Sequence, residues 1–519
     1  MGEAESLQAK VLDFMARPRN YEPAPATVER IETHASVVFL AGPFAYKVKR
    51  AVKYPFLDFS TLERRREACR NELRVNRRTA AQLYLEVLPI TIEESGNFRF
   101  GGEGRATEWV LKMRRFDQAK LFDRMASEGR LEVGAMPRLA DVIAAFHDSA
   151  DRVLAPDQAV RPLVEVLRDN ADAFAGIVAP EAGEELARLS RDRLAALSAR
   201  LKARAYGGFV RHCHGDLHLR NIVEIDGAPV LFDAIEFDDR LATIDVFYDL
   251  AFLLMDLGKR GLSRHANALL NAYLDAEAST GNLIGLAALP LFLSMRAAIK
   301  AKVEMLRARV APEDQAASVR EEARAYLSLA RDFLDPAAPR LIAIGGLSGS
   351  GKSAVARAIA PVIGAFPGAV HVRSDVERKR LFGVALSDRL PASAYAPEIS
   401  HRVYAMCRKR AAMALEGGQA VIVDAVHAKQ EERDALAALA AEHGIPFSGL
   451  WLEAPGRVMR DRVAARTGDV SDATPEVVDA QLGYDIGAQS FTVIDASKPV
   501  DHVAAACLER IGLKSRAHR

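Results

Sequence analysis

The chain has 519 residues, enough for roughly two to four domains of ordinary size. Half of the residues are apolar, 27% are charged, and the 34 glycines and 23 prolines are ordinary numbers, which excludes a disordered or collagen-like chain. The 70 Lys and Arg residues balance 69 Asp and Glu residues, for a net charge of +1. Proteins that bind nucleic acids or anionic membranes usually carry a basic excess, so the charge argues against both partners without excluding a local basic groove.

The cysteines and the apolar segments predict a cytoplasmic protein without a membrane span. The cysteines form no C-x-x-C pair and fit reduced, buried thiols at Cys69, Cys213, Cys407 and Cys507. The N-terminus lacks the basic stretch and apolar run of a signal peptide. The longest apolar stretches, such as residues 250–255, fall far short of the ~20 residues of a membrane helix.

Residues 1–115 are predicted to form a small α+β lobe. Segments rich in β-branched and aromatic residues predict strands at residues 36–40, 44–48 and 107–113. A charged helix is predicted at residues 61–80. Apolar residues then recur at helical spacing over 136–205 and again over 242–333, which predicts a larger helical lobe at 116–335.

Residues 212–221, HCHGDLHLRN, place an H-x-D triplet five residues before Asn221, the spacing of a kinase catalytic loop. In that arrangement Asp216 would accept the proton of the acceptor hydroxyl, and Asn221 would bind Mg²⁺. This loop has Gly215 where the H-R-D motif has arginine. In this it resembles the loop of the aminoglycoside and choline phosphotransferases, the small-molecule branch of the protein-kinase-like bilobal fold. The resemblance implies that Asp233, which follows a strand at 229–232, is the second metal-binding aspartate.

The same resemblance implies an Ala-x-Lys strand whose lysine binds the nucleotide phosphates. Lys47 fits this pattern, and Lys49, on the same face of the strand, is the alternative. The glutamate that orients the lysine should lie on the following helix, where Glu72 is preferred to Glu67. A G-x-G-x-x-G loop over the phosphates is absent, and residues 41–43 are the available substitute.

A domain boundary is predicted where two prolines follow the helix at residues 318–333. Proline ends a helix because it lacks an N–H donor and clashes with the preceding turn, and residues 341–344 then form a buried strand. The predicted parts are a kinase-like domain at 1–335, a linker at 336–339 and a second domain at 340–519. In the second domain strands alternate with helices, which predicts a parallel α/β sheet with strands at 341–344, 421–423 and 447–452.

Residues 346–353, GLSGSGKS, form a Walker A phosphate loop between a strand and a helix. Its glycines let consecutive N–H groups surround a phosphate at a helix N-terminus. Lys352 would reach the β- and γ-phosphates, and Ser353 would bind Mg²⁺. The residues predicted to bind the nucleotide are Gly346, Ser348, Gly349, Ser350, Gly351, Lys352 and Ser353.

A strand at residues 421–423 ends in Asp424, the expected position of a metal-binding aspartate. The following residue is Ala425, where ATP-hydrolysing motors usually place a glutamate that activates water. The absence of this glutamate favours transfer of the phosphoryl group to a bound acceptor over hydrolysis.

Residues 374–378, SDVER, follow a short strand and resemble the P-loop small-molecule kinases, in particular polynucleotide kinase and zeta toxins. The resemblance implies that Asp375 is the base for the acceptor hydroxyl and that Arg378 contacts the acceptor or a phosphate. A carboxylate at this position can accept the hydroxyl proton as the phosphoryl group arrives.

The arginine-rich stretch 457–466 looks like the lid of the same kinases. Arg462 and Arg466 are four residues apart, so one helical face would carry both of them over the transferring phosphates. An alternative is that they belong to a solvated helix.

Charged residues near the first motif give opposing hints about its acceptor. Four acidic residues could attract a cationic acceptor: Glu236, Asp238, Asp239 and Asp245. Arg296 and Lys300, four apart on one helix, could bind an anionic one. A solvated surface is the simpler interpretation of both sets, and the sequence does not identify the acceptor.

Over nearly its whole length the chain resembles bacterial fusions of an aminoglycoside-phosphotransferase-like domain with a zeta-toxin/polynucleotide-kinase-like P-loop domain. The resemblance implies two ATP- and Mg²⁺-dependent sites that phosphorylate hydroxyls of small molecules, in an oligomeric state that the sequence does not indicate. Two other functions stay open. The P-loop domain could phosphorylate a nucleic-acid 5′ end or a nucleotide sugar, or one domain could sense ATP and regulate the other.

Overall fold

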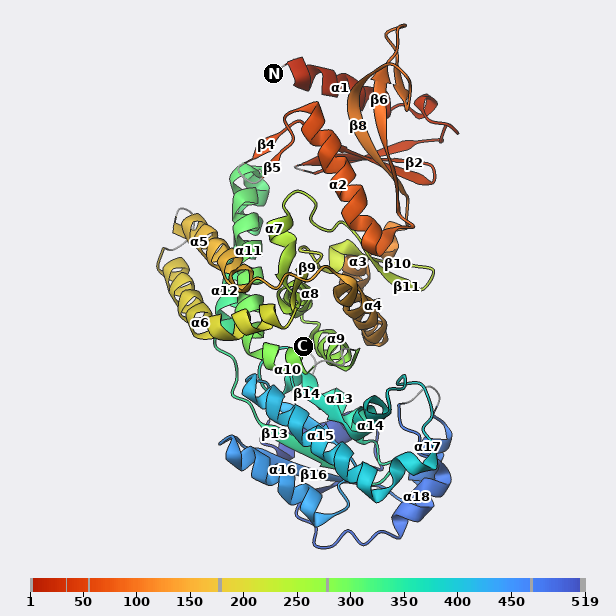
Figure 1. Cartoon of the computed structure of the whole chain (residues 1–519), viewed down its shortest axis with the longest axis vertical. Coiled ribbons are helices and arrows are strands. Elements are labelled where there is room, and N and C mark those ends of the chain that lie inside the picture. Colours follow the sequence, from red (N-terminus) through yellow and green to blue (C-terminus); the bar gives the residue numbers. More distant parts are fainter. Residues whose placement is uncertain are drawn as a thin grey trace. The chain divides into compact units, whose positions relative to one another are not determined.

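A computed structural model of the chain describes residues 3–33, 35–54, 57–175, 180–276, 280–466 and 470–513. Residue contacts divide the chain into two units. The first contains Met1–Glu132, Ala145–Val153 and Val210–Asp249, and the second contains Val133–Ala144, Leu154–Phe209 and Leu250–Arg519. Two helices contribute residues to both units, namely α4 (Met136–Ser149) and α8 (Val246–Lys259). Both helices are labelled in Figure 1.

An antiparallel sheet forms the core of the first unit. Among the described residues its strands are, in spatial order, β1 (Val28–Glu32), β2 (Ser36–Ala41), β3 (Phe44–Lys49), β8 (Arg105–Arg114), β6 (Tyr84–Ile92) and β7 (Phe98–Phe100). The three strands predicted from the sequence are confirmed as β2, β3 and β8, whereas β1, β6 and β7 were not predicted. Helix α1 (Glu3–Met15) packs Val11 and Met15 into one apolar cluster with Phe39 and Val48 of the sheet.

Helix α2 (Leu62–Ala80) confirms the charged helix predicted at residues 61–80. It begins after Thr61, whose hydroxyl accepts a hydrogen bond from the Arg64 N–H. The buried residues of α2 recur every three or four positions, so one face of this polar helix lies against β6 and β8. Glu72 belongs to that face and is fully buried.

Two short ribbons flank the predicted catalytic loop. Strand β9 (Val210–His212) pairs with β12 (Thr243–Asp245), and β10 (Ile222–Ile225) pairs with β11 (Ala228–Leu231), both antiparallel. The loop 213–221 runs from β9 to β10, so both of its ends are fixed by backbone hydrogen bonds. The remaining short elements of this unit are β4 (Lys53–Tyr54), β5 (Leu57–Asp58), α3 (Phe122–Ser127) and α7 (Asp239–Ala242).

Helices build the first part of the second unit, as the apolar spacing predicted. They are α5 (Arg161–Ala175), α6 (Pro180–Tyr206), α9 (Ser263–Ala276), α10 (Gly281–Gly285), α11 (Leu289–Val310) and α12 (Glu313–Leu334). Within the described ranges, one helical segment, Gly281–Arg309, is long and apolar enough to span a membrane, but 89% of its apolar window is buried inside the fold. Such burial is typical of the core helix of a soluble protein.

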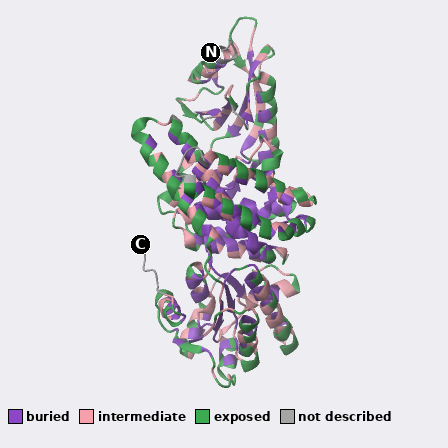
Figure 2. Cartoon of the chain, turned by 90° about the vertical axis from the view of Figure 1, so that its left-hand side faces the viewer, coloured by how far each residue is buried: buried purple, intermediate pink, exposed green. Residues whose placement is uncertain are grey.

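The C-terminal part of the second unit is a parallel sheet, which confirms the predicted α/β fold. In the part of the chain that the structure describes, its strands run in the order β14 (Val370–Arg373), β15 (Val421–Asp424), β13 (Leu341–Gly345), β16 (Phe447–Glu453) and β17 (Thr492–Asp495). Every residue of β13 and β15 is buried, as expected for central strands covered on both faces. Figure 2 shows buried strands between helices whose outer faces are exposed.

Helices of this α/β part follow the strands in the chain. They are α13 (Lys352–Ile359), α14 (Ser374–Phe382), α15 (Pro397–Glu416), α16 (Gln430–Glu442), α17 (Gly456–Ala464), α18 (Pro475–Leu482) and α19 (Val500–Arg510). Because β13, β14 and β15 are parallel, their carboxyl ends meet at one edge of the sheet. The phosphate loop, Asp375 and Asp424 all lie at or just after those ends.

Candidate active sites

Lys47 joins three segments of the first unit that are far apart in the sequence. Its ammonium group lies 2.7 Å from Glu72 Oε1 on α2 and 2.7 Å from Asp233 Oδ1 after β11. Burial alone would lower the pKa of Lys47, but the charges of Asp233 and Glu72 raise it well above its ordinary value. Lys47 therefore stays charged beside the predicted metal-binding aspartate.

Lys49 lies on the same face of β3 but in a different environment. Its side chain is 3% exposed, lies 2.6 Å from Glu72 Oε2 and also pairs with Glu236. Lys47, which contacts Asp233, keeps 16% of its side chain exposed. The two lysines share the carboxylate of Glu72. The ion pairs of Lys49 hold the Lys49 ammonium group in the interior.

Asp233 has a left-handed backbone conformation, with φ of 61°. Its N–H donates to Tyr84 Oη at 3.1 Å, and the N–H of Ala234 donates to Asn76 Oδ1 at 2.8 Å. This conformation costs about 1–3 kcal/mol outside glycine and concentrates at functional sites, and aspartate tolerates it better than most residues. Tyr84 and Asn76, which the sequence analysis missed, fix the backbone that directs Asp233.

The loop between β9 and β10 places the predicted base and a predicted metal ligand side by side. Asn221 Nδ2 donates to the main-chain oxygen of Asp216 at 3.0 Å and to its Oδ2 at 3.1 Å. His218 Nε2 lies 3.3 Å from the same carboxylate, and the Asp216 side chain is 38% exposed. The carboxylate is therefore oriented by its neighbours and still accessible to an acceptor.

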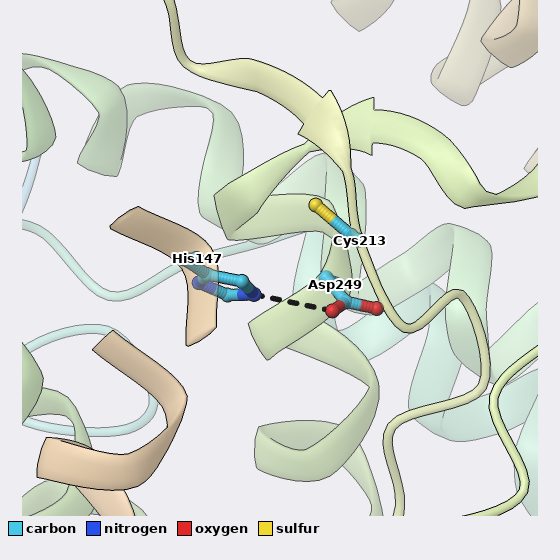
Figure 3. A group of neighbouring side chains, drawn as sticks. All are labelled: His147, Cys213 and Asp249. Atoms are coloured by element: carbon cyan, nitrogen blue, oxygen red, sulfur yellow. Dashed lines mark hydrogen bonds and ion pairs between the residues drawn. The ribbon is translucent and has the colours of Figure 1, made fainter. Parts of the chain in front are cut away.

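His147, Cys213 and Asp249 form a buried cluster (Figure 3), and Asp249 binds the backbone of this loop. Asp249 Oδ1 accepts the Gly215 N–H at 2.8 Å, and Oδ2 accepts the His214 N–H at 3.1 Å and lies 3.1 Å from His147 Nε2. The ligand atoms of His147, Cys213 and Asp249 lie within 4.8 Å of one another, close enough for a metal ion. Because both carboxylate oxygens already accept loop N–H groups, the cluster serves to hold the loop. Asp249 lies within an apolar helical run, and the sequence analysis missed it.

The charged residues considered as acceptor contacts have other partners. Glu236 forms the ion pair described above, and Asp245 Oδ1 accepts a backbone N–H at the start of α8 at 2.8 Å. Arg296 and Lys300 lie over the ring of Phe252, at 4.7 and 5.0 Å from its centre. These contacts explain both charged sets by the packing of the fold itself.

The phosphate loop has a backbone that only glycine adopts easily. Gly349 and Gly351 have φ of +82° and +97°, and a Cβ on Gly349 would collide with the main chain of α17. The N–H of Gly346 donates to the main chain after β15, and the N–H of Ser348 donates to Gln481 Oε1 of α18 at 2.7 Å. The loop is therefore held in its turned conformation from two sides.

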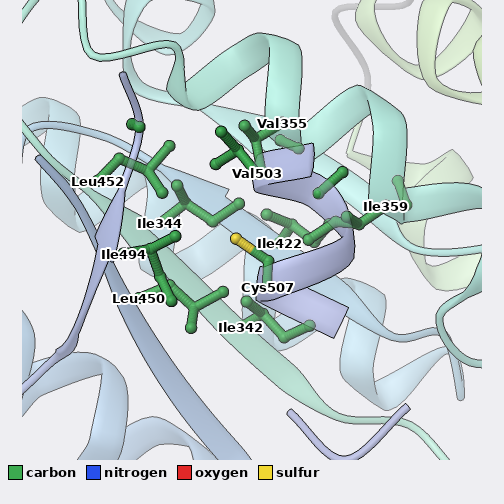
Figure 4. Packing of buried hydrophobic residues seen from close by; sticks show 14 of the residues in the cluster. Ile342, Ile344, Val355, Ile359, Ile422, Leu450, Leu452, Ile494, Val503 and Cys507 are labelled. Carbon is green, nitrogen blue, oxygen red and sulfur yellow. The ribbon is translucent and has the colours of Figure 1, made fainter. Parts of the chain in front are cut away.

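The core beneath the loop is apolar (Figure 4). Ile344 of β13, Val355 of α13 and Cys507 of α19 belong to one cluster of buried residues. Ser350, at the tip of the loop, is 1% exposed. This packing fixes the strand and the helix that flank the loop, so the first N–H groups of α13 have a fixed direction.

Ser353 and Asp424 meet at the start of α13. Ser353 Oγ donates to Asp424 Oδ2 at 2.5 Å, and His371 Nε2 of β14 lies 3.1 Å from the same oxygen. Burial would raise the pKa of Asp424, but the hydrogen bond with His371 and the charge of Lys352 help to lower it to about 2. An ionised carboxylate beside a hydroxyl is a pair of oxygen ligands that suits Mg²⁺.

A cavity of about 1150 Å³ opens at the carboxyl ends of the strands. The predicted site residues that line it are Ser348, Gly349, Gly351, Lys352, Ser353, Asp375, Arg378, Asp424 and Arg466. Burial lowers the pKa of Lys352, whose Nζ donates to Leu347 O at 3.0 Å. Burial raises the pKa of Asp375, the direction that suits a proton acceptor. One cavity thus contains the phosphate loop and the predicted base.

Arg378 uses its guanidinium group to hold one wall of this cavity. It donates to Ala394 O at 2.6 Å and to Ser400 Oγ at 3.3 Å, and it lies over the ring of Tyr395 at 4.6 Å. Arg378 is 6% exposed. Its present contacts are therefore with the protein segment that borders the cavity.

Arg462 and Arg466 do not share a helical face, so that prediction is wrong. Helix α17 ends at Ala464, and Arg466 lies two residues beyond it. Residues four apart are neighbours only inside a continuous helix. Arg466 lines the cavity, whereas Arg462 donates to the main-chain oxygens of Ser350 at 3.4 Å and Lys498 at 3.5 Å.

Two sequence families match these two regions separately. The phosphotransferase enzyme family matches residues 56–283, and a family described as an AAA domain matches residues 341–484. An uncharacterized protein of Mycobacterium tuberculosis is 31% identical over 473 residues, which cover 88% of this chain and 90% of that protein, and one of Mycobacterium bovis matches to the same extent. The chain belongs to the same family as these mycobacterial proteins. It is an ATP-dependent phosphotransferase built from a phosphotransferase domain and a P-loop kinase-like domain.

Solved structures of kinases are similar to parts of the chain. A choline/ethanolamine kinase family protein from Mesorhizobium loti covers 63% of this chain and 99% of its own, with 14% identity and a TM-score of 0.37. A gluconokinase from Sinorhizobium meliloti covers 33% of this chain and 93% of its own, with 24% identity and a TM-score of 0.24.

Proposed function

We propose that the chain carries two separate ATP sites, each of which transfers the γ-phosphoryl group to a hydroxyl of a small-molecule acceptor. The observation that supports this proposal is that each region brings together a lysine, carboxylates and other polar groups that fit phosphate binding, metal binding and proton transfer. In the phosphotransferase domain these are Lys47, Glu72, Asp216, Asn221 and Asp233. In the P-loop domain they are Lys352, Ser353, Asp375 and Asp424, together with the backbone of the phosphate loop.

In the first site, Lys47 binds the nucleotide phosphates while Glu72 holds its ammonium group. Lys47 is proposed over Lys49 because Lys47 touches Asp233 and is the more exposed of the two, at 16% against 3%. Asp216 accepts the proton of the acceptor hydroxyl as its oxygen bonds to the γ-phosphorus. The bond from that phosphorus to the β–γ bridging oxygen breaks, and ADP leaves.

In the second site, the loop N–H groups and Lys352 neutralise the β- and γ-phosphates. Asp375 accepts the hydroxyl proton of the acceptor, and the same bonds form and break as in the first site. Arg466, which lines the cavity, balances charge on the transferring group. Arg378 shapes the acceptor wall through Ala394 and Ser400, and Arg462 supports the phosphate loop from beside Ser350.

The donor sets of both sites fit Mg²⁺, which prefers carboxylate, amide and hydroxyl oxygens. Asn221 and Asp233 would hold the ion in the first site, and Ser353 and Asp424 would hold it in the second. When bound, Mg²⁺ supplies positive charge that neutralises phosphate oxygens. The chain's own residues then align the acceptor and take its proton.

Cavity size and charge support a small acceptor in the P-loop domain. A volume of about 1150 Å³ suits a nucleotide and a small molecule together. The net charge of +1 gives no general attraction for the phosphates of a long nucleic acid. The cysteines at 69, 213, 407 and 507 are buried thiols, which fits the reducing cytoplasm where ATP is abundant.

The proposal is tested by following labelled phosphate. The full-length protein is incubated with ATP that carries ¹⁸O in its γ-phosphoryl group, Mg²⁺ and a metabolite extract, and phosphate esters are sought by mass spectrometry. We expect one labelled ester that disappears with Asp216→Asn and a different one that disappears with Lys352→Ala. Label found in free phosphate or protein alone would contradict transfer to small molecules.

A further inference from the structure

Helix α9 covers the open edge of the P-loop domain's sheet. Strand β14 is an edge strand paired with β15, and the peptide groups on its other side need partners. Asn267 and Asn271 of α9 both donate to Ala369 O, at 3.1 and 3.2 Å, and Asn271 Oδ1 accepts the His371 N–H at 2.7 Å. Asn271 therefore offers β14 the donor and the acceptor that a neighbouring strand would offer.

The polar stripe on α9 continues to Asp275. Asn267, Asn271 and Asp275 are spaced by four residues, a rise of about 6 Å along the helix. Alternate residues of a strand lie about 6.6 Å apart, so the stripe keeps in step with β14. Two residues after His371, the guanidinium of Arg373 meets this stripe, 2.7 Å from Asp275 Oδ2.

The end of α9 also holds α14, the helix that carries Asp375. Arg380 of α14 donates to Asp275 O at 3.0 Å, and Arg410 of α15 donates to Leu274 O at 3.3 Å. The last carbonyls of a helix lack partners within the helix and attract cations, which these two arginines supply. Arg373, which directly precedes α14, and Arg380, within α14, thus both bind the C-terminal turn of α9.

These contacts connect the two domains through β14 and α14, which flank the proposed base Asp375. Helix α9 lies inside the 56–283 segment that matches the phosphotransferase enzyme family, and β14 lies inside the 341–484 segment that matches the AAA domain. Arg373 and Asp375 both line the P-loop cavity. The wall that carries the proposed base is therefore supported by a helix from the other domain.

We propose that Asp275 is a positioning residue for the P-loop site: it holds Arg373 away from Asp375 and fixes the start of α14. Asp275 acts through Arg373 and touches neither substrate. This inference rests on the proposed role of Asp375 as the base. The acceptor side of the P-loop site is complete only when the phosphotransferase domain supplies α9.

The charges around Arg373 explain why its partner matters. Burial would lower the pKa of Arg373, but Asp275 first, and then Asp424 and Asp375, raise it. The Arg373 side chain is 18% exposed, and a mostly buried guanidinium needs a carboxylate close by. Without Asp275, Arg373 would turn to Asp375 and occupy the oxygens that accept the acceptor's proton.

The test uses slow Mg·ATP hydrolysis by the full-length chain, in which water takes the acceptor's place. An Asp216→Asn background silences the first site, so the remaining hydrolysis reports on the P-loop site. We expect Asp275→Asn to lower kcat about tenfold and to leave KM for ATP within about twofold, because base geometry is lost and phosphate binding is kept. Asp275→Glu should restore most of kcat.

A double variant separates positioning from simple stability. If the damage comes from a released Arg373, Asp275→Asn combined with Arg373→Gln should have a higher kcat than Asp275→Asn alone. The matched control is Asp501→Asn. It removes an exposed ion pair of 3.8 Å between Arg264 of α9 and Asp501 of α19. This control should leave kcat unchanged.

Two results would overturn the inference while the proposed function stands. One is an unchanged kcat for Asp275→Asn when Asp375→Asn abolishes hydrolysis. The other is an equal loss of kcat for Asp275→Asn, Asp275→Glu and the Asp501→Asn control, which would indicate general loosening of the fold. Full hydrolysis by Asp375→Asn would refute the assignment of the base, and the inference would fall with it.

Discussion

The two proposed sites of this chain assemble similar groups by different means. In the phosphotransferase domain, Lys47, Glu72 and Asp233 come from distant segments and are held together by the ion pairs of Lys47 with the other two. In the P-loop domain, residues 346–353 present their own backbone N–H groups over an apolar core. A site made of mutual charge pairs should lose stability and activity together when one charge is removed. A site that binds phosphate with backbone N–H groups should lose activity but keep its stability when one charged side chain is removed.

The largest expected effect is that of Lys352→Ala on the P-loop site. Lys352 donates to a backbone oxygen of its own loop, and the buried carboxylate of Asp424 beside it keeps its hydrogen bonds with Ser353 and His371 when Lys352 is removed. We expect loss of the product made by the P-loop site and an unchanged melting temperature, measured by product labelling and calorimetry. The product of the phosphotransferase domain should persist. Its loss as well would contradict separate sites.

Glu72→Gln tests the opposite behaviour in the first site. Glu72 is fully buried and pairs with both Lys47 and Lys49, so its neutralisation leaves two ammonium groups short of a partner. We expect the free energy of unfolding of this domain to fall by about 3 kcal/mol in urea titrations. Glu67→Gln, on an exposed position of the same helix, is the matched control and should change it by less than about 0.5 kcal/mol. Equal effects of the two variants would contradict the charge-pair description.

Asp216→Asn should separate chemistry from binding in the first site. The amide keeps the shape of the side chain but cannot accept the hydroxyl proton. We expect phosphoryl transfer by this domain to fall about a hundredfold while its affinity for ATP is kept, as measured by product formation and by calorimetric titration. Wild-type rates would show that the base lies elsewhere.

A smaller effect is expected from pH at the P-loop site. Burial raises the pKa of Asp375, and only the ionised carboxylate can accept a proton, so activity should rise with pH through that raised pKa. The acid limb of kcat/KM should lie above the ordinary aspartate range near pH 4, measured in the Asp216→Asn background. An acid limb at or below pH 4 would contradict Asp375 as the base.

Local motifs in the sequence predicted much of the fold and several of the residues that the structure brings together in each proposed site. A strand, a glycine-rich turn and a helix within residues 341–359 define the phosphate loop, because the backbone itself makes the site. The contact within the loop 213–221 was equally predictable, since Asp216 and Asn221 lie five residues apart and hydrogen-bond directly. Apolar runs predicted the buried strands β13 and β15 for the same local reason.

Supporting groups that lie outside the sequence motifs were not predicted. Asp249 holds the loop 213–221 from an apolar helical run, and His371 contacts Asp424 from a neighbouring strand. No spacing rule marks such partners, because their meeting depends on the whole fold. The prediction for Arg466 failed for a different reason. It assumed that one helix carries both Arg462 and Arg466, whereas α17 ends at Ala464.

The central claim, two ATP sites in one chain, is tested most directly by counting them. Calorimetric titration of the full-length protein with a non-hydrolysable ATP analogue and Mg²⁺ gives the number of sites per chain. We predict two sites for the wild type and one site each for Lys47→Ala and Lys352→Ala. A single site in the wild type, or loss of all binding in either variant, would contradict the account.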